Sequence, residues 1–332
     1  MTFSELDIIS RISAMVPGQG SEVIKGLGDD CAVIRMDNDR LWLATADTLV
    51  ENVHFDYSWH PPGLLGRKTA SVNLSDIAGM GGRPSFALLS LALPVSVQEE
   101  WLTLFMQGFL AVLHEHDALL VGGDTVKSNH DAVFSVTVLG QIAADRVLYR
   151  SGAKPGDLVW VSGELGVAAA GLELCRQGRP HPEDEAWQKL VLAHLDPTPE
   201  VELGLLLAES GMVSAMMDTS DGLATDLAHL CEQSGIGSEI IAAKLPMPVA
   251  MAKVAACLGG SALNWALSGG EDYRLLFTSS PDNSATLPSL VKERMGREIY
   301  CIGTIVDGSG VVLIDGNQRR DITYKGYDHF AK

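Results

Sequence analysis

Short stretches that join Asp to Gly, Ser or Thr recur along the chain, mostly where an apolar, strand-like run begins or ends. They are Gly28-Asp29-Asp30, Thr45-Ala46-Asp47, Asn73-Leu74-Ser75-Asp76, Gly122-Gly123-Asp124, Asp218-Thr219-Ser220-Asp221 and Gly269-Gly270-Glu271-Asp272. Two carboxylates about 4 Å apart repel by about 4 kcal/mol at an effective dielectric constant near 20. A fold that gathers these stretches is therefore favourable only when cations neutralise the cluster.

Magnesium suits such a cluster, because hard cations take oxygen ligands and a short aspartate holds its oxygens close to a rigid strand end. The carboxylates that we expect on metal are those of Asp30, Asp47, Asp76, Asp124 and Asp218, with an oxygen of Thr45 beside Asp47. A single aspartate beside glycine is more often a turn or capping residue, which is our interpretation of Asp29, Asp37, Asp39 and Asp157.

The composition narrows the class of protein. The chain has 332 residues, 46% of them hydrophobic, and its length suggests two domains. The net charge of −18 argues against nucleic acid as a partner, but not against a small phosphorylated ligand whose charge metal ions offset. The five cysteines form no C-x-x-C pair, which favours a reducing compartment. With no signal peptide and no apolar run of about 18 residues, we expect a cytoplasmic protein and no membrane span.

Strand-like and helix-like segments alternate, which predicts an α/β or α+β class. Apolar spacing predicts helices over 4–12, capped by Ser4, and over 64–79, 97–116, 166–177 and 199–211, and one near Asp221 capped by Ser220 or Asp221. Apolar runs predict strands over 32–34, 41–45, 85–94, 118–121, 132–142, 158–162, 215–217, 238–242, 273–278, 300–306 and 311–314. Turn-forming residues over 150–157 place a domain boundary just before them.

Several common nucleotide and hydrolase motifs are missing from the sequence. It has no G-x-x-x-x-G-K-[ST] and no G-x-G-x-x-G after a strand, which excludes a P-loop and disfavours a nicotinamide-binding Rossmann domain. It also lacks the G-x-S-x-G elbow of α/β-hydrolases. The pairs Gly81-Gly82, Gly122-Gly123 and Gly269-Gly270 would let backbone N–H groups approach a phosphate, although tight turns use the same pairs.

Taken in order, the motifs resemble the motif series of the thiamine-monophosphate kinases over nearly the whole chain. They are residues 28–32 (GDDCA), 47–55 (DTLVENVHF), 73–81 (NLSDIAGMG), 122–125 (GGDT), 218–223 (DTSDGL), 268–273 (SGGEDY) and 326–330 (GYDHF). The resemblance implies a two-domain fold like that of aminoimidazole ribonucleotide synthetase. Residues 1–148 would form a sheet domain that binds metal and ATP and pairs with its twin in a homodimer. Residues 149–332 would form an α/β domain that completes the site, with ATP between the domains.

The resemblance also implies a reaction and a set of site residues. ATP and thiamine monophosphate would give thiamine diphosphate and ADP. The magnesium positions of the family fall on Asp30, Thr45, Ala46, Asp47, Asp76, Asp124, Asp218 and Asp221, the ATP positions on Gly123, Asp124, Arg150 and Ser220, and the positions near thiamine phosphate on His54, Glu271 and Tyr327. Many relatives have a hydroxyl residue at the position of Ala46, so this chain would use the backbone carbonyl there.

This reaction requires no strong general base, and we assign none, because the attacking phosphate oxygen is already ionised at pH 7. Magnesium ions and Arg150 would offset the repulsion between two anions during in-line transfer. From the residues alone, Arg150 is equally well a surface side chain, and Tyr327 a packing residue. Trp42 and Trp59 are assigned to packing.

Two other functions fit the sequence. One is an ATP-dependent enzyme of the same fold with a different acceptor. The other is a non-enzymatic module whose carboxylates bind divalent metal only to stabilise the fold, and which would bind metal without any dependence on nucleotide.

Overall fold

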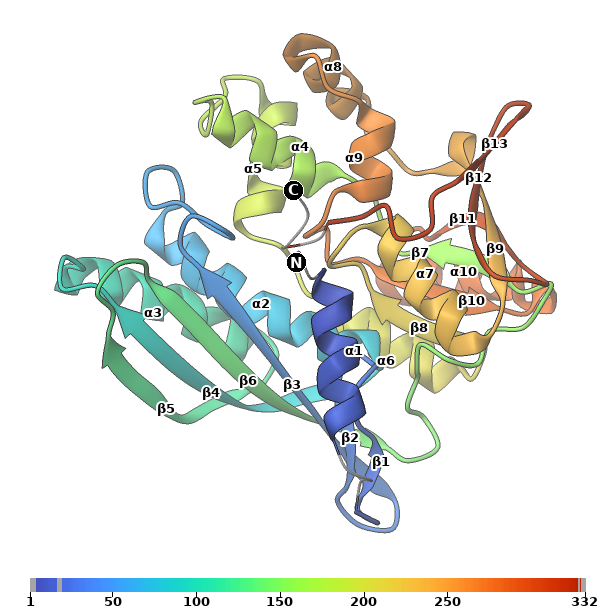
Figure 1. The fold of residues 1–332 in the computed structure, drawn as a ribbon, viewed down its shortest axis with the longest axis horizontal. Helices are drawn as coiled ribbons and strands as arrows, with labels where there is room; N and C mark the ends of the chain where they lie inside the picture. Colours follow the sequence, from blue (N-terminus) through green and yellow to red (C-terminus); the bar gives the residue numbers. More distant parts are fainter. Residues whose placement is uncertain (1–3, 17–19, 328, 330–332) are drawn as a thin grey trace.

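The computed structural model describes residues 4–16, 20–327 and 329; of the C-terminal GYDHF motif, Asp328 and Phe330 lie outside this range. The chain builds two sheets, one in each half, which lie side by side with helices packed against and between them (Figure 1). Helices and strands are mixed in both halves, which confirms the α/β (α+β) class. The described part contains no helix that is long and apolar enough to cross a membrane.

The first sheet has six strands in the order β1-β2-β3-β6-β4-β5. Their bounds are β1 Val23–Lys25, β2 Ala32–Arg35, β3 Arg40–Val50, β4 Arg83–Leu93, β5 Leu119–Lys127 and β6 Val133–Ala143. Neighbouring strands are antiparallel except β4 and β5, which are parallel. In β3 the buried and less buried side chains alternate, and Thr45 and Asp47 lie midway along the strand on the same face as the buried Leu43. On this face they contact Asp76 and Asn73 of the second helix of this half.

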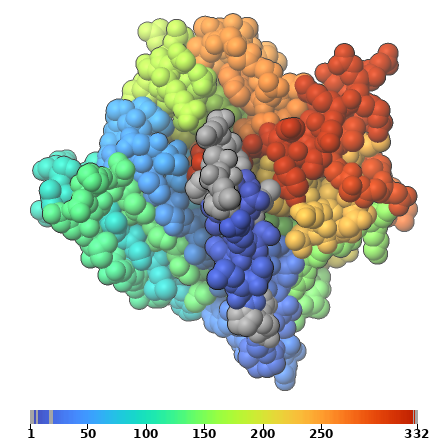
Figure 2. Space-filling view, in the orientation of Figure 1, coloured from blue at the N-terminus to red at the C-terminus, as the bar shows by residue number. Residues whose placement is uncertain are grey.

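The helices of this half are α1 Glu5–Met15, α2 Pro62–Gly79 and α3 Glu99–Glu115. Helix α2 is buried on nearly all sides, because small residues let its neighbours come close. A Cβ on Gly66 would lie 1.9 Å from the carbonyl oxygen of Phe105, so only glycine permits this contact with α3. Helix α1 begins at the expected cap, since Ser4 and Asp7 form a capping box. It lies across the front of the molecule, between the two halves (Figure 2).

The second sheet has seven strands in the order β13-β12-β9-β11-β7-β10-β8. Its strands are β7 Leu158–Val161, β8 Val213–Asp218, β9 Gly237–Ile241, β10 Leu275–Ser279, β11 Tyr300–Val306, β12 Gly310–Asp315 and β13 Gln318–Asp321. The helices are α4 Val167–Arg176, α5 Glu185–Leu195, α6 Val201–Ser210, α7 Leu223–Ser234, α8 Val249–Leu258, α9 Ala262–Ser268 and α10 Thr286–Met295, with short 3₁₀ turns η1 Ala242–Lys244 and η2 Pro281–Asn283.

Three features differ from the sequence predictions. Strand β5 does not end before Gly122-Gly123-Asp124 but continues through them to Lys127, because β4 pairs with it along that length. Helix α7 begins at Leu223 with Gly222 as its N-cap and no capping side chain, so the predicted cap at Ser220 or Asp221 is wrong. The elements β1, β13, α5, α8, α9 and α10 were not predicted.

Helix α2 joins the two halves. It contacts α6, β8 and α5 of the second half as well as β3 and β6 of the first. A single apolar core continues from the first sheet to Trp160, Met216 and Phe277 of the second. At the C-terminal end of α2, a Cβ on Gly79 would lie 2.3 Å from Asp30 Oδ2 and 2.9 Å from the backbone nitrogen of Asp218. The glycine therefore lets residues from both halves meet at one point.

Candidate active site

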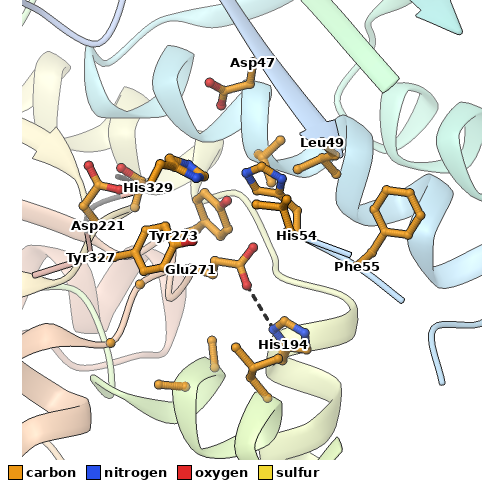
Figure 3. Close-up of a pocket in the computed structure, with 18 of the residues that line it drawn as sticks. Asp47, Leu49, His54, Phe55, His194, Asp221, Glu271, Tyr273, Tyr327 and His329 are labelled. Carbon is orange, nitrogen blue, oxygen red and sulfur yellow. Dashed lines mark ion pairs between the residues drawn. The ribbon is translucent and has the colours of Figure 1, made fainter. Parts of the chain in front are cut away.

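A cavity of about 960 Å³ opens between the two halves of the chain. Its lining includes Asp30, Thr45, Ala46, Asp47, His54 and Asp76 from the first half, and Arg150, Ser220, Asp221, Glu271 and Tyr327 from the second. Figure 3 shows Asp47 on one side of the cavity and His194 on the opposite side, with Glu271 between them and Asp221 beside Tyr327. The structure therefore brings most of the predicted site residues into one space.

The acidic end is assembled from four separate elements. Asp30 precedes β2, Asp47 lies on β3 and Asp76 on α2, and these three line the cavity. Asp218 ends β8 and is buried beside them without lining the cavity. Neighbouring polar groups hold several of these residues in place. Thr45 Oγ1 donates a short hydrogen bond to Asp76 Oδ2, and Ser75 Oγ donates to Asp218 Oδ2 at 2.5 Å. The backbone N–H of Asp47 donates to Asn73 Oδ1 at 3.0 Å.

Proximity and burial make this cluster hard to ionise. Burial, followed by repulsion from Asp30, raises the pKa of Asp218 to about 8. Burial outweighs the Arg150 guanidinium and raises the pKa of Asp30 to about 6. Burial together with Asp47, Asp218 and Asp30 holds the pKa of Asp76 well above its ordinary value. Burial also raises the pKa of Asp47. Ionising the whole cluster at pH 7 would therefore require positive charge beyond that of Arg150, which bound metal ions would supply.

The donor set suits magnesium, although the side chains are not arranged as a finished site. Among the residues that the structure describes, no three His, Cys, Asp or Glu side chains converge on one point. Asp30 Oδ2 is buried without a hydrogen-bond partner, and the cluster supplies carboxylate and hydroxyl oxygens of the kind that Mg²⁺ prefers. Ala46 lines the same space and offers only its backbone carbonyl.

Arg150 binds a carboxylate of the cluster in this structure. Its Nη2 lies 2.6 Å from Asp30 Oδ1, and its Nε donates to the same oxygen at 2.8 Å. Asp221 lies on the loop before α7, where burial, followed by the charge of Glu5, raises its pKa to about 6. Ser220 lies on the same loop and also lines the cavity. Arg150 is thus the cation through which the cluster is partly neutralised.

Gly123 and Asp124 stand apart from the other predicted site residues within one chain. They lie on β5, which β6 and β4 separate from β3, and Asp124 is exposed. At a spacing of about 4.8 Å between strands, β5 is roughly 14 Å from β3. Gly123 has a φ of +153°, and a Cβ there would lie 1.8 Å from the carbonyl oxygen of Leu89, so the position requires glycine for packing alone.

The other end of the cavity holds the residues predicted near thiamine phosphate. His54 Nδ1 accepts from the backbone N–H of Val50 at 3.0 Å, and burial lowers the pKa of His54. The rings of His54 and Tyr327 both pack against His329, with centroid distances of 5.0 Å and 4.9 Å. These rings form one wall of the cavity (Figure 3).

Four residues that contact Glu271 or line the same cavity were not identified as functional residues in the sequence analysis. Lys68 is fully buried and lies behind Glu271, while His194 contacts it from α5. Trp59 and Trp265 line the cavity, whereas Trp59 was predicted only to pack. Nothing near Lys68 or His194 in the sequence indicates burial or pairing, because both contacts join residues far apart in the chain.

Two family models match the chain, one in each half. Residues 28–142 match the family model of the AIR synthase related protein, N-terminal domain, and residues 154–316 match that of the C-terminal domain. A thiamine-monophosphate kinase from Salmonella typhimurium is 37% identical over 100% of this chain and 99% of its own length. The chain belongs to the thiamine-monophosphate kinase family, which confirms the resemblance seen in its motifs.

Solved structures agree with this assignment. A structure described as "AaThiL complexed with AMPPCP and TMP" is 32% identical, covers 98% of this chain and 97% of that one, and has a TM-score of 0.83. The thiamine-monophosphate kinase of Stenotrophomonas maltophilia K279a is 36% identical, with coverage of 94% and 96% and a TM-score of 0.77. The two-domain fold expected from the resemblance is therefore confirmed.

Proposed function

We propose that this protein uses ATP to phosphorylate thiamine monophosphate, giving thiamine diphosphate and ADP. The observation that carries the proposal is a single cavity with two unlike ends. Its acidic end, around Asp30, Asp47, Asp76 and Asp218, needs added cations, as a magnesium–nucleotide site does. Its other end presents the ionised Glu271 and aromatic rings to an organic cation. A relative described as holding AMPPCP and TMP together supports this pairing.

The residues of the chain would bind and orient the two anions. A phosphate oxygen of thiamine monophosphate forms a bond to the γ-phosphorus of ATP, while the bond from that phosphorus to the β,γ-bridging oxygen breaks and ADP leaves. No side chain has to remove a proton, so we propose no general base. Asp30, Thr45, Ala46, Asp47, Asp76, Asp124, Asp218 and Asp221 would hold magnesium. When bound, magnesium supplies positive charge that lowers the repulsion between the phosphates.

The remaining roles are those that the family's motif positions imply. Arg150, Ser220, Gly123 and Asp124 would bind ATP between a domain of residues 1–148 and a domain of residues 149–332. Arg150 would exchange Asp30 for a phosphate, since its planar fork suits both. His54, Glu271 and Tyr327 would contact thiamine monophosphate, since all three line the same cavity.

A homodimer would explain the separate position of Gly123 and Asp124. Strand β5 is an edge strand, and it exposes Leu119, Val121 and Val126 by 61%, 57% and 51%. A long apolar edge of this kind favours pairing with another chain. We propose that a second copy covers β5, and that Asp124 takes part in metal and ATP binding in that dimer. All five cysteines are unpaired, which fits the cytoplasm.

Product analysis tests the proposal. The protein is mixed with ATP, Mg²⁺ and thiamine monophosphate, with free thiamine as a parallel acceptor, and the products are separated by chromatography. We expect thiamine diphosphate from the monophosphate only, dependent on Mg²⁺. ATP turnover without thiamine diphosphate would mean a different acceptor. Metal binding with no nucleotide chemistry, and no nucleotide-dependent stabilisation, would mean the metal-binding module.

A further inference from the structure

A buried lysine lies directly behind the floor of the cavity. Lys68, on α2 of the first half, has no exposed surface, and its Nζ lies 2.8 Å from Oε1 of Glu271 in the second half. Lys68 does not itself line the cavity, whereas Glu271 does. A cation in this position can therefore act on a ligand only through the carboxylate in front of it.

The second oxygen of Glu271 has its own partner. His194 Nδ1, near the end of α5, lies 3.0 Å from Glu271 Oε2 (Figure 3). Burial lowers the pKa of His194, so its ring is neutral at pH 7 and an Nδ1–H suits this contact. His60 packs near His194, with ring centroids 6.3 Å apart, and its Nε2 lies 3.0 Å from the carbonyl oxygen of Leu195. The ring of His60 thus packs near the ring of His194 and is itself fixed by the backbone of Leu195.

The backbone of Glu271 is fixed as well. It adopts a left-handed conformation with a φ of +69°, which is uncommon for a residue with a side chain. Its backbone N–H donates to the carbonyl oxygen of Ser220 at 2.8 Å, and a Cβ on Gly270 would lie 2.6 Å from that same oxygen. The loop that carries Glu271 is thus held against the loop of Ser220 and Asp221, while its side chain is held from both sides.

We propose that Lys68 and His194 are positioning residues which hold Glu271 as an ionised hydrogen-bond acceptor, and that this selects a substrate bearing an N–H donor or fixed positive charge. The inference rests on the proposed function, in which that substrate is thiamine monophosphate. An ionised carboxylate only accepts hydrogen bonds, whereas a protonated one also donates, so the ionisation state determines which ligand atoms fit.

The charges around Glu271 support this role. Burial alone would favour the neutral carboxyl, but the Lys68 ammonium and His194 hold the pKa of Glu271 well below its ordinary value. One edge of the carboxylate stays open, since its side chain is 21% exposed. A buried ion pair gives little net stability compared with apolar residues of the same size, so a pair placed directly beside a binding cavity fits a role in binding better than one in stability.

The test compares Lys68→Met, Lys68→Arg and the packing control Ser71→Ala, which alters another buried residue of α2. We expect Lys68→Met to raise KM for thiamine monophosphate by about tenfold, which corresponds to one hydrogen bond of ~1.4 kcal/mol, with KM for ATP unchanged. Lys68→Arg should restore most of the loss, and Ser71→Ala should change neither constant. In a Glu271→Gln background, Lys68→Met should raise KM no further, because its effect passes through that carboxylate.

Other outcomes overturn the inference. If Lys68→Met lowers Tm but leaves KM for thiamine monophosphate unchanged, or raises both KM values equally, then Lys68 is only a structural ion-pair partner. If Lys68→Met fails to fold, His194→Gln must show the same split between the two KM values. Calorimetric binding of thiamine monophosphate separates this inference from the proposed function, because it needs no turnover. Binding that weakens in Lys68→Met without any product would contradict the kinase but support the role of Lys68, and wild-type protein that binds none would contradict both.

Discussion

The cavity holds two kinds of buried carboxylate within one space. At the acidic end, burial and mutual repulsion raise the pKa of Asp30, Asp76 and Asp218. At the other end, Glu271 keeps a side chain that is 21% exposed, and Lys68 and His194 lower its pKa. Burial raises the pKa at both ends, so the opposite direction at Glu271 arises from the cation that the fold places beside it.

The two ends of the cavity differ in where their positive charge comes from. The Glu271 end contains its own counter-ion and is ready for a substrate before any ion arrives. Arg150 pairs with Asp30, and the aspartates around it would need further positive charge from solution to ionise. In the proposed function, one cleft would hold an organic cation at one end and a magnesium–nucleotide complex at the other.

The largest expected effect comes from removing the charge of Glu271. Its contacts with Lys68 and His194 define what we call the paired end of the cavity. Glu271→Gln leaves the Lys68 ammonium buried without a charge partner, and we expect a loss of about 3 kcal/mol in the free energy of unfolding. Urea unfolding measures this loss. A change below about 0.5 kcal/mol would mean that Lys68 is neutral or hydrated, contrary to the account.

Breaking the acidic end should act on activity, and with the opposite sign on stability. Asp218→Asn keeps an acceptor for Ser75 but removes a carboxyl group whose ionisation the buried cluster opposes. We expect kcat to fall on the order of 100- to 1,000-fold, because charge stabilisation of the transferring phosphate is lost. Without Mg²⁺ the variant should be at least as stable as the parent by urea unfolding. A destabilised variant that kept its kcat would contradict the assignment.

A smaller effect, dependent on pH, tests whether His60, which packs near His194 at the paired end, stays neutral in the folded protein. Burial lowers the pKa of His60 to about 3, so below about pH 6.5 the unfolded chain binds a proton that the folded chain does not. Stability should therefore fall as pH falls from 6.5 towards 3, by about 1.4 kcal/mol per pH unit for this residue. His60→Gln should remove that part of the slope in unfolding curves taken between pH 6.5 and 5. An unchanged slope would show that the fold does not lower the pKa of His60.

The smallest effect is expected at an exposed ion pair, which serves as the control for Glu271→Gln. Glu298 lies 3.4 Å from Lys292 in a pair whose side chains are 66% and 60% exposed. Water and salt screen such pairs, so Glu298→Gln, the same chemical change as at Glu271, should alter stability by less than about 0.5 kcal/mol. Urea unfolding of both variants gives the contrast directly, and similar losses at the two sites would remove burial as the explanation.

The acidic end could be predicted from the sequence, because its signal is local. Asp47 and Asp218 lie on predicted strands or at their ends, and Asp76 lies on a helix predicted almost to its bounds. The family membership inferred from the ordered motifs was also correct. Of the helices after residue 184, α6 and α7 were predicted, whereas α5, α8, α9 and α10 were not.

The paired end could not be predicted, because its contacts are made only by the tertiary fold. Lys68 follows Arg67 on α2, a setting typical of a solvated face, and only the packing of α2 between the two halves buries it. His194 reaches Glu271 from a helix that the sequence analysis did not identify. The exposure of Asp124 was hidden for the same reason, since β5 could not be placed at the edge of the sheet without its pairing.

The most direct test is the dependence of Tm on Mg²⁺ concentration, measured with ATP present for the parent, Asp218→Asn and Glu271→Gln. A ligand that binds only the folded state raises Tm with its concentration. We expect Tm to rise saturably with Mg²⁺ for the parent and to rise much less for Asp218→Asn. For Glu271→Gln we expect the full rise in Tm, from a lower starting value. Equal rises in all three, or loss of the rise only in Glu271→Gln, would contradict the assignment of metal to the acidic end.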